Sequence, residues 1–381
     1  MNRREIFAAT LAHQQPERVL VDYGKHIGSF HANAYKNLKG KFGIKTETKI
    51  LDRMAQNVVL DEEICQRLGI DFRWVVPNWV GVRDVEIDGE RGYIDMWQTP
   101  HKWTDVGQYY AIHASPLNME TLTQADIDNF SWPQPDPAMF TDLREQAKYL
   151  HDNTDYVVGA DGIKVGILQT ASQLRGYDKL FLDFSINPGI AHQFLDRLSA
   201  TINSMYRQYM EAVGQYVQVV VITDDQGTQN SLMISPKMFR EFIKPRLKSL
   251  IETIKSTADV KVFMHCDGAI TKIIPDLIEI GVDILNPIQT VVKGMEDTKA
   301  LKEQFGAQIS FHGGIDVQRV LPNYTPEQIR QEVKLRLNDL GKNGGYIIAP
   351  CHNINVDIPL ENTLAMFNTA KEFGTYSLQG E

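Results

Sequence analysis

The chain has 381 residues, of which 43% are hydrophobic and 23% are charged, a composition typical of a soluble globular protein with a large core. Only three cysteines occur, Cys65, Cys266 and Cys351, which excludes a disulfide framework and favours a reducing compartment such as the cytoplasm. The formal net charge of -9, without a strongly basic run, argues against a nucleic-acid partner, and no apolar run reaches the length of a membrane span.

The residues up to about 150 give mixed signals and predict an α+β extension. In chain order we expect a helix at 3–13, a strand at 19–24, a helix at 50–68, a strand at 71–76, antiparallel strands between 85 and 103, and a helix at 138–151. Asp88-Gly89 supplies the turn chemistry of a hairpin within the antiparallel region. The prolines between Trp132 and Pro137 predict a stiff connection before the last of these helices.

Between about 155 and 375, apolar strands alternate with amphipathic helices. We expect strands at 217–222, 260–264, 282–285, 309–311 and 346–349, and helices at 236–257, 270–280 and 326–340. Such alternation is typical of parallel β-structure covered by helices. Neither G-x-G-x-x-G nor G-x-x-x-x-G-K-[ST] occurs, so a nucleotide-binding Rossmann or P-loop fold is not indicated.

Polar side chains follow the ends of these apolar strands. They are Asp224, Asp225, His265, Asp267, Asn286, Gln289, His312, Asp316 and Cys351. In a (β/α)8 barrel the carboxyl ends of the strands form the mouth where active sites assemble. A single Asp or Asn at such a position can equally well cap a helix, but its repetition at strand after strand favours a common pocket.

A zinc site is one interpretation of this pocket, because thiolate and imidazole ligands suit zinc and a catalytic zinc needs three protein ligands with one open position. His265 and Cys351 form the strongest pair. The third candidate is Asp267 or Cys266, and alternation along a strand favours Asp267, which shares a side with His265. The other interpretation treats Cys266 and Cys351 as small buried hydrophobic residues, since no C-x-x-C pair occurs, and Cys65 is expected in the core.

The chain resembles the uroporphyrinogen decarboxylase superfamily, in particular its corrinoid-linked methyltransferase branch. The similar segments are TDDQGTQNSLMISPKMFREFIKPRLK (223–248), VFMHCDGAI (262–270), DILNPIQ (283–289), SFHGGIDVQRVLP (310–322), GGYIIAPCHNINVDIPLENTLAM (344–366), NRREIFAATLAHQQPERVLVDYG (2–24) and SWPQPDP (131–137). The resemblance implies a single domain over residues 1–381. This domain is an α/β TIM (β/α)8 barrel with an N-terminal α+β extension, in which the extension covers about 1–150 and the most regular barrel part about 155–375.

In the methyltransferase branch, a His-x-Cys motif and a later Cys bind zinc. The resemblance places these ligands at His265, Asp267 and Cys351, with Asp267 where the family has Cys and with Cys266 as the alternative third ligand. It implies Zn2+ as the cofactor, and methylcobalamin or another corrinoid, free or on a corrinoid protein, as the co-substrate. It also implies a thiol or another small molecule as the methyl acceptor, since a metal-bound thiol ionises to the thiolate that attacks the methyl group.

The remaining site residues are assigned by their expected position at the mouth. We expect catalytic roles for Asp224, Asp225 and His312. We expect substrate contacts from Gln229, Asn286, Gln289, Asp22 and His26. Structural roles in turns and hydrogen-bond networks are the alternative for each of them.

Two other functions are compatible with the resemblance. Uroporphyrinogen decarboxylases have an arginine-rich R-Q-A-G-R loop after the first strand that binds the substrate's carboxylates, whereas residues 22–29 here contain Lys25 and His26 and no arginine. Decarboxylation of a tetrapyrrole, with Asp22 or Asp224 stabilising a protonated pyrrole, is therefore the second hypothesis. A non-catalytic corrinoid-binding module is the third. No nucleic-acid or membrane partner is expected, and a homodimer is compatible with the sequence.

Overall fold

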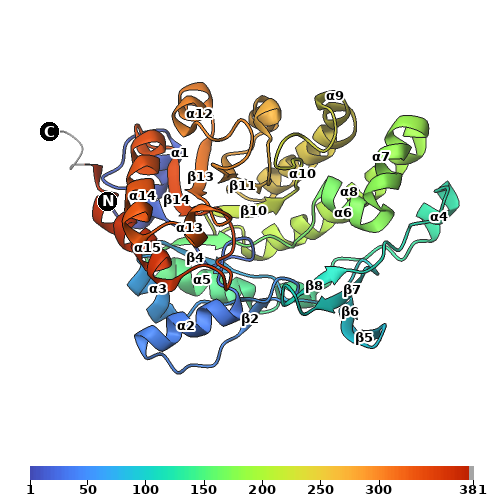
Figure 1. Cartoon of the computed structure of the whole chain (residues 1–381). Helices are drawn as coiled ribbons and strands as arrows, with labels where there is room; N and C mark the ends of the chain where they lie inside the picture. Colours follow the sequence, from blue (N-terminus) through green and yellow to red (C-terminus); the bar gives the residue numbers. More distant parts are fainter. Residues whose placement is uncertain (377–381) are drawn as a thin grey trace.

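A sheet of eight parallel strands forms the centre of the computed structural model, which describes residues 1–376 (Figure 1). The strands, in spatial order, are β1 (Leu20–Val21), β14 (Tyr346–Pro350), β13 (Ser310–Ile315), β12 (Ile284–Ile288), β11 (Lys261–His265), β10 (Val219–Thr223), β9 (Val157–Ala160) and β4 (Phe72–Val75). The edge strands β1 and β4 adjoin, because the amide of Asp71 donates to the carbonyl of Val21 at 2.8 Å. The sheet therefore closes into a TIM barrel, which confirms the predicted fold class.

Helices cover the outside of the barrel and connect its strands, as parallel pairing requires. They are α1 (Arg3–Leu11), α2 (Ala32–Phe42), α3 (Glu62–Leu68), α4 (Gln124–Asn129), α5 (Leu143–Asn153), α6 (Ile167–Arg175), α7 (Tyr177–Ile186), α8 (Pro188–Val213), α9 (Pro236–Met238), α10 (Lys244–Thr257), α11 (Ile274–Glu279), α12 (Thr298–Phe305), α13 (Val320–Asn323), α14 (Pro326–Gly341) and α15 (Leu360–Phe373). Single turns of other helix types occur at Pro137–Phe140, Phe239–Ile243 and Thr271–Ile273. Within residues 1–376, no helix has both the length and the apolar character needed to cross a membrane.

Alternating side chains divide the hydrophobic core into an inner part, inside the barrel, and an outer part between the sheet and the helices. In β11, Phe263 belongs to the inner core, whereas Met264 and the following Cys266 belong to the outer core. The N-terminal helix α1 adds Ile6 and Phe7 to the inner core. The interior of the barrel is therefore packed with apolar side chains below the carboxyl ends of the strands.

A separate antiparallel sheet lies beside the barrel and appears below α6 and α7 in Figure 1. It consists of β5 (Arg83–Ile87), β6 (Glu90–Ile94), β7 (Pro100–Thr104) and β8 (Tyr109–Ile112). Asp88 and Gly89 both have positive φ, 51° and 77°, at the tight turn between β5 and β6. The antiparallel strands predicted between 85 and 103 are confirmed.

The helix expected at 50–68 is wrong over its first half. Residues 50–58 instead form the antiparallel pair β2 (Ile50–Asp52) and β3 (Asn57–Val58), and only α3 is helical. The carboxylate of Asp52 accepts from the amide of Met54 at 2.8 Å, and this local bond turns the chain out of a helix. The barrel strands β1 and β4 lie within the first 150 residues, which were expected to form the extension. The strand β9 and the helices α6 to α8 are not among the predicted elements.

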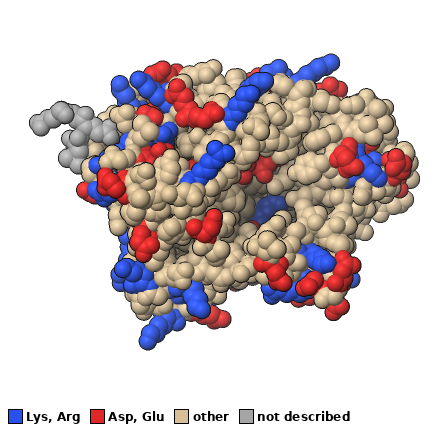
Figure 2. All heavy atoms as spheres, viewed as in Figure 1, with Lys and Arg blue, Asp and Glu red and all other residues tan. Residues whose placement is uncertain are grey.

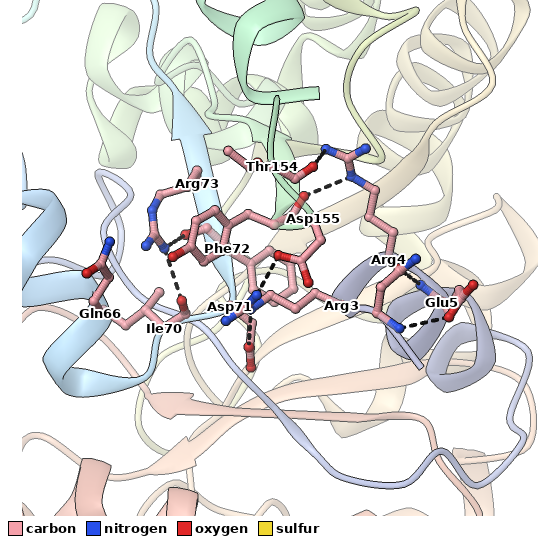
Figure 3. Close-up of polar contacts among 12 residues, drawn as sticks. Arg3, Arg4, Glu5, Gln66, Ile70, Asp71, Phe72, Arg73, Thr154 and Asp155 are labelled. Atoms are coloured by element: carbon pink, nitrogen blue, oxygen red, sulfur yellow. Dashed lines mark hydrogen bonds and ion pairs between the residues drawn. The ribbon is translucent and has the colours of Figure 1, made fainter. Parts of the chain in front are cut away.

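Asp71 ties the N-terminal helix to the seam between β1 and β4 (Figure 3). Its carboxylate is 2% exposed and accepts from Arg3 at 3.1 Å, from Arg18 at 2.8 Å and from the amide of Val21 at 2.9 Å. Arg3 also pairs with Asp155, whose side chain is exposed. Charge-assisted hydrogen bonds of this kind are stronger than neutral ones, so the seam depends on the Asp71 charge.

Replacing Asp71 by Asn is expected to lower the free energy of unfolding by about 2 kcal/mol, because the buried carboxylate loses its charge-assisted bonds to the two arginines. Urea denaturation followed by circular dichroism measures this change. Asp155→Asn is the matched control, since Asp155 contacts the same Arg3 from the surface, and it should cost less than about 0.5 kcal/mol. An equal loss of unfolding free energy in Asp71→Asn and Asp155→Asn would contradict the role of Asp71 in the seam.

Candidate active site at the barrel mouth

Buried polar side chains surround a hollow at the carboxyl ends of the barrel strands. Figure 2 shows the molecule hollowed near the centre of this view, with acidic and basic side chains visible inside. His265 ends β11, Asn286 lies in β12 and His312 lies in β13, and all three are buried. The structure therefore brings these three predicted residues together from three neighbouring strands.

A continuous chain of hydrogen bonds runs from Asp22 to His265 across the inside of the barrel. Nε2 of His312 lies 2.9 Å from Oδ2 of Asp22, next to the end of β1. Nδ2 of Asn286 lies 2.8 Å from Nδ1 of His312, and Nδ1 of His265 lies 2.6 Å from Oδ1 of Asn286. Trp74 donates to the other oxygen of Asp22 at 2.9 Å. The chain consequently determines the orientation of the His265 ring.

This chain of hydrogen bonds also determines where the hydrogens lie. An ionised Asp22 can only accept, so Nε2 of His312 carries a hydrogen and Nδ1 of the neutral ring accepts from the amide nitrogen of Asn286. The amide oxygen of Asn286 then accepts from Nδ1 of His265. In the neutral ring of His265 the lone pair therefore lies on Nε2, and this tautomer can bind a metal ion through Nε2.

A fully buried lysine keeps Asp22 ionised. Burial raises the pKa of Asp22, but the charge of Lys25, whose Nζ lies 2.5 Å away, and the hydrogen bond from His312 outweigh burial and lower the pKa to about 2. Burial and the Lys25 charge lower the pKa of His312 to about 4. Nζ of Lys25 also lies 4.9 Å from the ring centre of Trp74 and 5.1 Å from that of Phe263. At neutral pH, Asp22 is therefore ionised and His312 is neutral.

The lowered pKa of His312 is expected to make folding less stable as the pH falls from 6.5 to 4. An unfolded histidine takes up a proton near pH 6.5, whereas His312 in the folded protein resists protonation down to about pH 4. The unfolded state binds more protons in this window, so the free energy of unfolding decreases by about 3 kcal/mol through this residue. Urea denaturation gives the free energy of unfolding of the native protein and of His312→Asn at pH 7 and at pH 4. The difference between the two proteins should be about 3 kcal/mol smaller at pH 4 than at pH 7. A difference that does not change with pH would contradict the assignment.

Two carboxylates lie close to Nε2 of His265. Oδ2 of Asp267 is 3.7 Å from it and Oδ1 of Asp225 is 4.0 Å from it. Asp225 also accepts from the amide of Asp267 at 2.9 Å, which orients this loop. Burial, and then the charge of Asp267, raise the pKa of Asp225. Oδ1 of Asp267 is buried and has no hydrogen-bond partner within residues 1–376, so this oxygen is available to a cation.

His265, Asp267 and His352 offer ligand atoms that all lie within 4.8 Å of one another. His352 follows β14, and its ring centre is 5.6 Å from that of His265. Burial lowers the pKa of His352, which favours the neutral imidazole that binds metals. Two imidazoles and one carboxylate fit a divalent metal ion such as zinc.

The two cysteines predicted for the site are both buried thiols. Sγ of Cys351 donates to the carbonyl of Ile288 at 3.1 Å, and Cys351 does not belong to the group defined above. Cys266 belongs to the outer core and faces away from His265. Burial raises the thiol pKa of both cysteines. Asp267, and not Cys266, therefore lies beside His265 in this structure.

Three further predicted residues hold the loops around the mouth. Asp224 is fully buried and accepts from two backbone amides at the start of α6, at 2.9 and 3.1 Å, and burial raises its pKa to about 7 against these bonds. Gln289 accepts from the amide of Gly268 at 2.7 Å. Gln229 is exposed and lies 3.3 Å from the side chain of Gln318. These contacts connect loops to one another at the rim of the mouth.

A second His–Asp pair lies at the mouth and includes a residue outside the prediction. Nδ1 of His26 lies 2.5 Å from Oδ1 of Asp161, which follows β9. Nearby, Nζ of Lys164 lies 3.0 Å from Asp52. Residues 157–160 form a strand that lies outside the predicted elements. A polar residue directly after a strand is a candidate for the mouth, and Asp161 is such a residue. His352 directly follows the predicted Cys351 in the sequence. No sequence pattern indicates that Lys164 pairs with Asp52.

Comparisons with known proteins agree with this architecture. The family model for uroporphyrinogen decarboxylase (URO-D) matches residues 108–373. A uroporphyrinogen decarboxylase of Psychromonas ingrahamii is 22% identical over 292 residues, which cover 74% of this chain and 77% of the relative. A methylated-thiol–coenzyme M methyltransferase of Methanosarcina mazei is 25% identical over 202 residues, 53% of this chain and 50% of the relative. The solved structure of a methyltransferase from Methanosarcina mazei shares the fold, with a TM-score of 0.65 at 17% identity over 98% of this chain and 99% of that chain.

Proposed function

The chain belongs to the uroporphyrinogen decarboxylase family, and we propose that it is a zinc-dependent methyltransferase of this family that moves a methyl group between a corrinoid and a thiol or another small acceptor. The observation that carries the proposal is the group of His265, Asp267 and His352 at the mouth. In this group Nδ1 of His265 is bonded to Asn286, so Nε2 of the neutral ring carries the lone pair, and Oδ2 of Asp267 lies 3.7 Å from Nε2. The similarity to a methylated-thiol–coenzyme M methyltransferase supports the reaction class.

The proposed zinc ligands are His265 and Asp267, with a third ligand from Cys351 or His352. His352 lies within 4.8 Å of the other two, and the adjacent Cys351 has the thiol that the family resemblance favours. Zinc, when bound, would lower the pKa of the acceptor thiol and hold it as a thiolate. Its positive charge would also counteract burial and the Asp267 charge, which together raise the pKa of Asp225.

The residues of this chain have separate tasks in the proposed reaction. Asp22, His312 and Asn286 orient His265 and place the hydrogen of its neutral ring on Nδ1. Asp225 holds the backbone of the Asp267 loop. The packed inner core closes the barrel below the site, so the acceptor and the corrinoid, free or on a corrinoid protein, must both approach from the mouth.

Decarboxylation of a tetrapyrrole, the activity for which the Psychromonas ingrahamii relative is named, is supported less by this mouth. Residues 22–29 contain no arginine for binding several carboxylates. Lys25, the cation of this segment, is fully buried and paired with Asp22. It is therefore not available to a polycarboxylate substrate.

Metal analysis and a methyl-transfer assay test the proposal together. The purified full chain is expected to bind about one zinc ion and to convert methylcobalamin to the demethylated corrinoid in the presence of 2-mercaptoethanol, as followed by visible absorption. Cys351→Ser and His352→Gln identify the third ligand, because before any thiol is added, cobalt bound in place of zinc shows thiolate charge-transfer absorption only if a cysteine is a ligand. Protein that binds no metal, together with release of carbon dioxide from uroporphyrinogen, would overturn the proposal in favour of the decarboxylase.

A further inference from the structure

His26 and Asp161 form a buried pair at the part of the mouth that the carboxyl ends of β1 and β9 supply. His26 follows β1 and Asp161 follows β9. Asp161 accepts from Nδ1 of His26 at 2.5 Å, from the amide of His26 at 2.8 Å and from the amide of Gly162 at 2.8 Å. Asp161 is fully buried, and three donors converge on its carboxylate. A carboxylate held by three donors can stabilise a positive charge on the adjacent imidazole.

The second nitrogen of His26 is free. Because Asp161 accepts the hydrogen on Nδ1, Nε2 of the neutral ring carries a lone pair. Nε2 has no hydrogen-bond partner among residues 1–376, and it is not among the nitrogen atoms sealed from solvent. A Cβ at position 162 would lie 3.0 Å from Cε1 of His26, so the glycine there leaves room for the ring.

The charged groups around His26 come from three elements of the mouth. Besides Asp161, they are Asp52 of β2, Lys164 of the loop after β9, and His352 after β14. His26 is close enough to Asp52 and to His352 to interact electrostatically with both, and Nζ of Lys164 lies 3.0 Å from Asp52. His26 therefore lies near both this ion pair and the proposed metal ligand His352.

We propose that His26, oriented by Asp161, is the general base that takes the proton of the methyl acceptor. The S–H bond of the acceptor breaks, its electron pair stays on sulfur, and the proton forms an N–H bond with Nε2 of His26. The resulting imidazolium is stabilised by the carboxylate of Asp161, the arrangement that activates nucleophiles in other His–Asp enzymes. This inference rests on the proposed function, because it names the residue that receives the proton in that reaction.

The test measures how thiol binding depends on pH. The cobalt-loaded full chain is titrated with 2-mercaptoethanol between pH 7.5 and 8.5, above the ordinary pKa of histidine, about 6.5, and up to that of a thiol, about 8.5. In the native protein the proton stays on His26, so the dissociation constant is expected to be independent of pH. In His26→Gln the proton leaves to solvent, so the dissociation constant is expected to fall about tenfold per pH unit.

Two variants serve as controls for this titration. The glutamine of His26→Gln can still donate to Asp161, and equal thermal unfolding temperatures check that the loop is intact. His101→Gln changes another buried histidine paired with an aspartate, Asp95 at 2.9 Å, in the antiparallel sheet, and it should behave as the native protein. If thiol binding has the same pH dependence in the native protein and in His26→Gln, His26 is not the general base, and the proposed function is unaffected. A native protein without thiol-to-cobalt absorption would overturn the proposed function and this inference with it.

Discussion

Replacing His265 by Gln is expected to abolish zinc binding and to lower methyl transfer by more than about a hundredfold. Partners that only orient a metal ligand typically change metal affinity 10- to 100-fold, so the loss of the ligand itself should exceed this range. The glutamine side chain keeps a donor for Asn286 but offers no imidazole lone pair beside Asp267. Elemental analysis after dialysis gives the zinc content, and the methylcobalamin assay gives the rate.

Asn286→Leu is the companion variant to His265→Gln. It leaves every proposed ligand in place but removes the oxygen that accepts from Nδ1 of His265 and the amide that donates to His312. Zinc affinity is expected to fall 10- to 100-fold, measured by competition with a chelator. His101→Gln, in the antiparallel sheet and not among the proposed ligands, should keep full zinc content. Full zinc content in His265→Gln would contradict its role as a ligand, and unchanged affinity in Asn286→Leu would contradict the hydrogen-bond argument.

The barrel and the inner side of β11 could be predicted because both depend on local sequence. Apolar runs followed by helices indicate parallel strands, and alternation indicates that His265 and Asp267 share a side while Cys266 faces the helices. The structure agrees with this placement of all three side chains. The polar residues after each strand likewise indicate the mouth of the barrel.

The pairings inside the mouth could not be predicted, because they join residues that are far apart in the chain. Asp22 and His312 are 290 positions apart, and His26 and Asp161 are 135 positions apart. Neither the composition nor the spacing of residues contains information on such contacts. The incorrect helix at 50–68 has a similar cause, since β3 pairs with β2 and also bridges to His31, and these contacts override the local helical pattern.

Replacing Lys25 by Met is expected to lower the free energy of unfolding by about 3–5 kcal/mol, because it leaves the ionised Asp22 buried without its cation. Urea denaturation measures the change. The double variant Asp22→Asn/Lys25→Met removes both charges and is expected to recover most of the loss, giving a coupling energy of at least about 2 kcal/mol in the double-mutant cycle. If Lys25→Met does not fold, a stable double variant still shows that the unpaired charge of Asp22 causes the loss.

Two results would contradict the role of this ion pair: a Lys25→Met protein as stable as the native one, or a double variant as unstable as the single one. The double variant also separates stability from metal binding. An amide oxygen at position 22 can still accept from Nε2 of His312, so the hydrogen-bond chain to His265 remains possible without the buried charge. We therefore expect the double variant to keep its zinc, in contrast to His265→Gln, because the Lys25 charge stabilises the barrel whereas the hydrogen-bond chain orients the metal ligand.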